Sequence, residues 1–195
     1  MGHLLANPDL AYQRLQQRLD RMPTGAPDSA VFQQILRLLF TEEEAQIAAA
    51  MPTVCSMAVL AKRTGSTVKE LDPKVDAMAA KGLVLDLENN GERYVALAPV
   101  VIGFFEFTFM RVREDAPMEQ LAELFHEYMF DDDSFAHSVF AGSTQIGRSL
   151  VREESLPDEP QVEVLDWELA THIVSEADSV AVSECPCRTH MNLID

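Results

Sequence analysis

The fold of this 195-residue chain is indicated by one stretch, SMAVLAKRTGSTVKELDPKVDAMAAKGLVLDLENNGERYVALA (56–98). The first half places apolar residues at helical spacing in two runs that a glycine-containing turn separates. The period then changes, because LVLDL (83–87) and ERYVALA (92–98) have the composition of strands. Asn90-Gly91 between them provides the positive φ values of a tight connection. The stretch therefore predicts two helices followed by a β-hairpin.

Two further helices are expected upstream. DSAVFQQILRLLF (28–40) has an apolar face, and either Asp28 or Ser29 can cap it. Thr41 and the three glutamates after it are typical of the N-cap and first turn of a helix that ends near Pro52. These helices would precede the two helices and the hairpin of the first stretch.

Helix, helix, turn, helix and hairpin is the element order of a winged helix-turn-helix. We therefore predict a winged-helix domain at 28–110, preceded by an N-terminal helix within 1–27. One detail stays open between two alternatives. The helix after the turn either continues to Gly82, or a shorter helix begins at Pro73, which is preceded by Asp72.

The remaining residues, 111–195, predict a smaller α/β portion. After a helix at 118–130, VEVL (162–165) and SVAVSE (179–184) have strand composition, and DWELATHIVSEA (166–177) between them has helical spacing. This pattern is typical of a compact β-α-β unit with parallel strands. The predicted fold class is therefore α+β.

Composition argues against several classes of function. The chain has 32 acidic and 15 basic residues, a net charge of −17, which should repel nucleic acid. The expected recognition segment, 66–82, balances three lysines with three acids and lacks Arg, Asn and Gln for base contacts. The sequence shows no signal peptide, and no apolar run approaches the roughly 18 residues of a membrane span. A cytoplasmic protein is expected.

Catalytic motifs of hydrolases, nucleotide-binding loops and zinc proteases do not occur in the sequence, so no catalytic residue is assigned and enzymatic activity stays open. Three cysteines in a chain of this length do not form a disulfide framework. Cys55 lies in an apolar context and is expected to be a buried structural thiol. His126 is expected at the edge of a helix.

The segment CPCRTH (185–190) carries the clearest chemical signal. Cys185 and Cys187 are thiols of the kind that bind zinc and iron–sulfur clusters, and Arg188 could offset the negative charge of a thiolate-bound cluster. The pair supplies half the ligands of a [4Fe–4S] cluster, and with His190 three ligands for zinc. The alternatives are two inert thiols or an exposed pair prone to oxidation. A short turn after a strand is expected to carry the pair.

Four runs of the sequence resemble one protein family: GAPDSAVFQQILRLLFTEEEAQIAAAMP, LAKRTG, VDAMAAKGLVLDLENNGERYVALAPVVIGFFEF and VLDWELATHIVSEADSVAVSECPCR. Together they are similar to the N-terminal half of bacterial and archaeal 4Fe-4S ferredoxin-type iron–sulfur proteins. In that family a winged-helix region precedes a Cys-x-Cys-Arg segment and then cysteine-rich ferredoxin motifs. The resemblance matches Cys185 and Cys187 to the family's first cysteine pair, and Arg188 to the arginine that follows.

The resemblance implies the N-terminal module of an iron–sulfur electron-transfer protein or oxidoreductase, with the winged helix as a docking or dimerisation scaffold. The remaining ligands would come from a downstream ferredoxin region or another polypeptide, and this chain by itself is compatible with no cofactor. A redox partner protein is implied. Two other functions stay open: a redox- or metal-responsive winged-helix regulator that binds DNA, and an interaction module without chemistry.

Overall fold

The computed structural model describes residues 8–111, 113–141 and 167–194. These residues fall into two units, one with residues 8–141 and 184–194 and the other with residues 167–183. The described helices include none that is long and apolar enough to cross a membrane. With many helices and a small antiparallel sheet, the chain is an α+β protein, as predicted.

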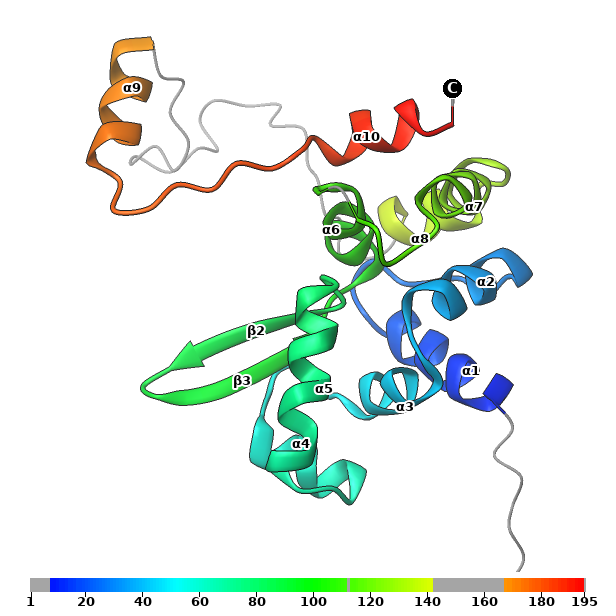
Figure 1. The fold of residues 1–195 in the computed structure, drawn as a ribbon. Coiled ribbons are helices and arrows are strands. Elements are labelled where there is room, and N and C mark those ends of the chain that lie inside the picture. The colour runs from blue at the N-terminus through cyan, green and yellow to red at the C-terminus, as the bar shows by residue number, and fades with distance from the viewer. Residues whose placement is uncertain (1–7, 112, 142–166, 195) are drawn as a thin grey trace, which may run out of the picture. The chain divides into compact units, whose positions relative to one another are not determined.

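The first unit contains most of the helices and the sheet (Figure 1). Its elements in chain order are α1 (Pro8–Asp20), α2 (Ala30–Leu39), α3 (Glu42–Ala50), β1 (Cys55–Ser56), α4 (Met57–Thr64), α5 (Val68–Ala80), β2 (Val84–Asn89), β3 (Glu92–Leu97), η1 (Val100–Phe104), α6 (Phe105–Phe109), α7 (Met118–Phe130), α8 (Ser134–Phe140) and α10 (Pro186–Asn192).

Local capping explains where α2 and α3 begin. The Ser29 hydroxyl accepts a hydrogen bond from the Phe32 amide at 3.0 Å, so Ser29 is the N-cap of α2. Thr41 and Glu44 form a capping box at the start of α3, in which each side chain accepts from the other residue's backbone amide. The predicted helices at 28–40 and after Thr41 are confirmed.

Helix α5 is continuous through Pro73. A second capping box, between Thr67 and Glu70, starts the helix one turn before the proline. Leu71, Val75 and Met78 are buried along one face, so packing holds both halves in a single helix. The alternative of a shorter helix that begins at Pro73 is therefore wrong.

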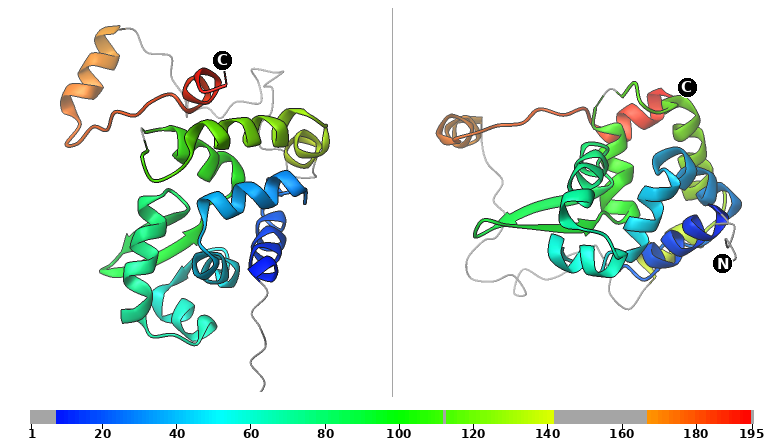
Figure 2. Two further views of the ribbon diagram at one scale, coloured as in Figure 1. Left: turned by 45° about the vertical axis from the view of Figure 1, so that its right-hand side comes forward. Right: turned by 60° about the horizontal axis from the view of Figure 1, so that its bottom comes forward.

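The sheet has three antiparallel strands in the order β1-β3-β2. Asn90 and Gly91 both have positive φ, +53° and +77°, so the predicted hairpin and its turn are confirmed. Strand β1, only two residues long, was not predicted; it pairs Cys55 with Val95 of β3. The hairpin of β2 and β3 projects away from the helices (Figure 2).

A continuous hydrophobic core joins the elements of the first unit. The ring of Phe125 on α7 lies 5.2 Å from that of Phe105 and 5.8 Å from that of Phe109. Phe32 on α2 stacks on Tyr128 of α7 at 4.6 Å, which joins the first helices to the later ones. The core therefore continues on both sides of residue 110.

The second unit corrects part of the predicted β-α-β pattern. Its helix is confirmed as α9 (Trp167–Glu176). The predicted strand at 162–165 lies outside the described residues. The predicted strand at 179–184 is wrong, because these residues are irregular and pair with no strand of the described chain; the side chains of Val180 and Val182 are 67% and 98% exposed. Strand composition alone does not produce a strand without a neighbour to pair with.

Candidate functional site

The Cys-x-Cys segment forms the start of a helix. Cys185 is the N-cap residue of α10, Pro186 is the first helical residue and Cys187 the second. Proline suits this position because its φ is already helical and it needs no hydrogen-bonded amide there. The Cys185 carbonyl accepts from the Thr189 amide at 2.9 Å. The predicted short turn after a strand is therefore wrong, and both thiols are exposed on the first turn of α10.

The core of the first unit holds this segment on both sides. Before the cysteines, the Glu184 amide donates to the Met110 carbonyl at 2.9 Å. After them, α10 lies beside α6 (Figure 1), and Leu193 and Ile194 pack against the hydrophobic core. The exposed thiols are thus carried on a backbone that is fixed before and after them.

His190 is the main anchor of α10. Its side chain is buried, and its Nε2 donates to the Ala122 carbonyl of α7 at 2.9 Å. The ring packs edge-on against Phe105 and Phe109, and it stacks on the ring of His126 at 6.0 Å. Burial lowers the pKa of His190; the hydrogen bond to Ala122 opposes this shift, and His126 adds to it.

The four predicted site residues are therefore in two environments. Cys185, Cys187 and Arg188 are exposed, whereas His190 points into the core and has only Nδ1 left for a ligand. Within residues 8–111, 113–141 and 167–194, no group of three or more His, Cys, Asp or Glu side chains is arranged to hold a metal ion. The metal roles of Cys185, Cys187 and His190 and the cofactor-binding role of Arg188 stay predictions.

The other two residues singled out in the sequence belong to the packing of the first unit. Cys55 is buried in β1 as expected, and burial raises the pKa of its thiol while Arg63 opposes that rise. His126 is half-buried on α7 beside Phe130, and its Nδ1 has no hydrogen-bond partner among the described residues. Within the described residues, neither side chain forms a hydrogen bond or ring contact with the exposed cysteines.

Carboxylates neutralise much of the surface expected to read DNA. Lys74 of α5 pairs with Glu43 at 2.5 Å, and Lys81 pairs with the largely buried Glu44 at 2.8 Å. Arg93 of the hairpin bonds three aspartates, and its hydrogen bonds to Asp86 and then Asp76 raise its pKa above the ordinary value against the opposing effect of burial. Those partners are Asp72, Asp76 and Asp86. Cations occupied in this way have few donors left for phosphate contacts.

Comparison with protein-family models, with curated proteins and with solved structures gives no match for this chain. The functional argument therefore rests on the geometry of its own residues.

Proposed function

We propose that this chain is the N-terminal module of an iron–sulfur electron-transfer protein or oxidoreductase, in which Cys185 and Cys187 supply two ligands of a [4Fe–4S] cluster. One observation carries the proposal: both thiols are exposed on a turn that is fixed to the core by Glu184 before it and by His190 after it. A cluster site requires accessible cysteine side chains at fixed positions, and this segment offers two of them.

The donor set fits half of such a site. A [4Fe–4S] cluster takes four cysteine ligands, and the chain contains three cysteines, of which Cys55 is buried. Two thiolates would therefore come from a downstream ferredoxin region or from another polypeptide. Arg188, next to Cys187 and exposed, would offset part of the negative charge of the bound cluster. A bound cluster supplies one-electron transfer to a redox partner.

We further propose that residues 28–110 form a winged-helix scaffold used for docking or dimerisation. The order α3, β1, α4, α5, β2, β3 and the sheet order β1-β3-β2 support this assignment. The ion pairs of Lys74 and Arg93 favour contact with protein over contact with DNA, because their positive charges are already paired with carboxylates.

The test is anaerobic purification of the gene product together with any sequence that follows Asp195. We expect broad visible absorption from thiolate-to-iron charge transfer and about four irons per cluster site. Cys185→Ser combined with Cys187→Ser should remove that absorption and the bound iron. Cys55→Ala is the matched control, because it also removes a thiol but from the packing around β1.

Two results would contradict the proposal. One is a complete gene product, with all of its cysteines reduced, that binds neither iron nor zinc. The other is a cluster that survives the double serine variant with unchanged iron content. Circular dichroism of each variant shows whether the fold is retained, so that loss of iron is not confused with unfolding.

A further inference from the structure

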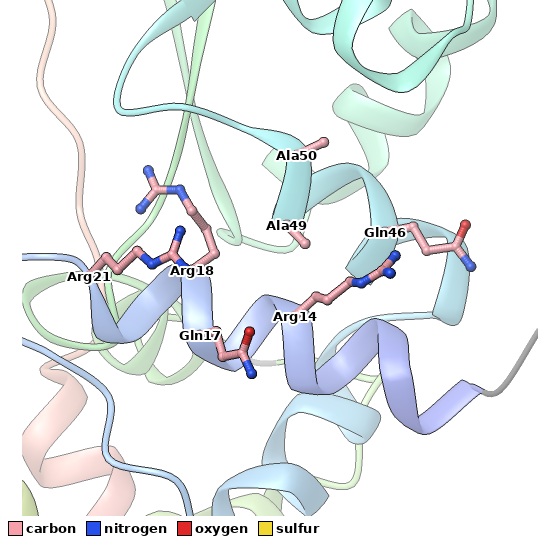
Figure 3. Close-up of a pocket in the computed structure, with 7 residues that line it drawn as sticks. All are labelled: Arg14, Gln17, Arg18, Arg21, Gln46, Ala49 and Ala50. Carbon is pink, nitrogen blue, oxygen red and sulfur yellow. The ribbon is translucent and has the colours of Figure 1, made fainter.

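Three arginines line a pocket between α1 and α3. Arg14 and Arg18 lie four residues apart on one face of α1, and Arg21 follows directly after the end of the helix, three residues beyond Arg18. Together with side chains of α3 they enclose a cavity of about 340 Å³. Figure 3 shows the arginines beside the three residues of α3 that complete the lining, which are Gln46, Ala49 and Ala50. Gln17, on α1, is the seventh residue of the lining. We call this site the arginine pocket.

The charge of the arginine pocket is unusual for this chain. No carboxylate lines the cavity, and within the described residues none of its three arginines forms an ion pair. Elsewhere in the same unit, Arg37, Arg93 and Arg113 each pair with at least one aspartate. In a protein with a net charge of −17, three neighbouring guanidinium groups without acids form a local site for an anion.

The backbone of the chain holds part of the pocket in place. Arg18 donates from Nε to the Met51 carbonyl at 2.6 Å and from Nη2 to the Pro52 carbonyl at 2.9 Å. Arg63 of α4 donates to the Ala50 carbonyl at 2.7 Å, which brings a fourth guanidinium close to the lining. Burial lowers the pKa of Arg18, and the positive charges of Arg21 and Arg63 lower it further. These positive charges repel one another, and an anion between them would offset that repulsion.

Two features of the lining set the size of the anion. Ala49 and Ala50 have small side chains, so they leave room above α3, and the cavity volume is at the lower end of the range of about 300–1,000 Å³ found for small-molecule sites. An extended polyanion would also meet the acidic remainder of the surface, including the exposed Glu43. A compact anion meets only the arginines and the amides of Gln17 and Gln46.

We propose that the arginine pocket binds the phosphoryl group of a small molecule. Guanidinium groups present planar forks of N–H donors that match phosphate oxygens, and several of them can share one phosphoryl group. Arg18 shapes the site, while the exposed Arg14 and Arg21 supply free donors. This site is separate from the cysteine segment, so its function does not depend on a bound cluster.

The test is isothermal titration of the chain with inorganic pyrophosphate and with phosphate at constant ionic strength. Arg14→Gln combined with Arg21→Gln should weaken pyrophosphate binding about tenfold or more, since each lost charge-assisted hydrogen bond lowers affinity. Arg18 is left unchanged because it bonds two carbonyls. Lys62→Gln combined with Lys69→Gln removes the same charge from exposed positions and should leave binding unchanged.

Three outcomes would overturn the proposal. The first is no heat of binding with either anion. The second is equal binding by the wild type and the Arg14/Arg21 double variant while both remain folded by circular dichroism. The third is tighter binding, per chain, of a DNA oligonucleotide or an acidic peptide that competes with pyrophosphate, because the site would then recognise a macromolecule.

Discussion

At the scale of single residues, His190 connects the candidate cluster segment to the core. One hydrogen bond to Ala122 and two aromatic contacts hold the turn of α10 that follows the exposed thiols. The ring is desolvated, so its protonated form is disfavoured in the folded state. The protonation of one side chain therefore affects the stability of the segment that carries Cys185 and Cys187.

We predict that the free energy of unfolding falls as the pH decreases from 7 to 5. The folded-state pKa of His190 lies below the ordinary value of about 6.5, so the unfolded chain takes up the proton first. The stabilising contribution of His190 is complete when the pH is above its pKa in the unfolded chain. It is lost as the pH falls toward its lower pKa in the folded chain. Urea unfolding at pH 7, 6 and 5 measures how steeply the free energy of unfolding changes with pH.

His190→Gln should flatten this slope, because glutamine keeps an N–H donor for Ala122 and does not titrate. The matched control is His137→Gln on α8, which makes the same replacement at an exposed position. An identical slope in wild type and His190→Gln would contradict the prediction. His126 stacks on His190, so His126→Gln measures separately how much His126 contributes to the pH dependence of stability.

At the scale of elements, the end of α5 is defined by a glycine that also contacts the next layer. Gly82 has a φ of +76°, and a Cβ built there would lie 2.4 Å from the Cβ of Phe107. Gly65, at the end of α4, has a similar φ of +70° but nothing within 4 Å of such a Cβ. The two glycines share one backbone requirement and differ in steric surroundings.

We predict that Gly82→Ala is clearly more destabilising than Gly65→Ala. The left-handed backbone alone should cost roughly 1–2 kcal/mol in either variant. At Gly82 the added methyl group must also displace Phe107, which should add about 1–3 kcal/mol. Chemical denaturation of both variants measures the difference. Equal losses of stability would mean that α6 moves away from the end of α5 without cost.

At the scale of the whole molecule, the first unit has one core and not two. Phe125 lies within 5.2–6.3 Å of the rings of Phe104, Phe105 and Phe109. The stacking of Phe32 on Tyr128 continues that cluster to α2. The helices on either side of residue 110 therefore share buried surface, and we expect them to unfold together.

We predict that Phe125→Ala lowers the free energy of unfolding by about 3–5 kcal/mol, the usual cost of truncating a buried aromatic residue. Hydrogen exchange should then show a similar loss of protection in β3 and in α7. Phe130→Ala on the same helix is the control, because Phe130 is 65% exposed and should cost little. Loss of protection in α7 alone would show that the two parts unfold separately.

Features of the fold that depend on short-range chemistry could be predicted from the sequence. The Thr41 cap, the Asn90-Gly91 turn and the helices of 28–82 follow from residues within a few positions of one another. The strand predicted at 179–184 is wrong because it rested on composition alone, and composition does not supply the pairing that a strand requires. The candidate cysteines were visible as a motif.

The amino-acid sequence by itself determined the α+β class, the order of the helices up to the hairpin and the position of the Cys-x-Cys pair. Only the tertiary structure decided that His190 is an anchor in the core and that three arginines, on α1 and just after it, share a pocket with α3. The physical reason is distance along the chain. Caps and turns are satisfied by neighbours, whereas the contacts of His190 and Arg18 join residues 68 and 33 positions apart.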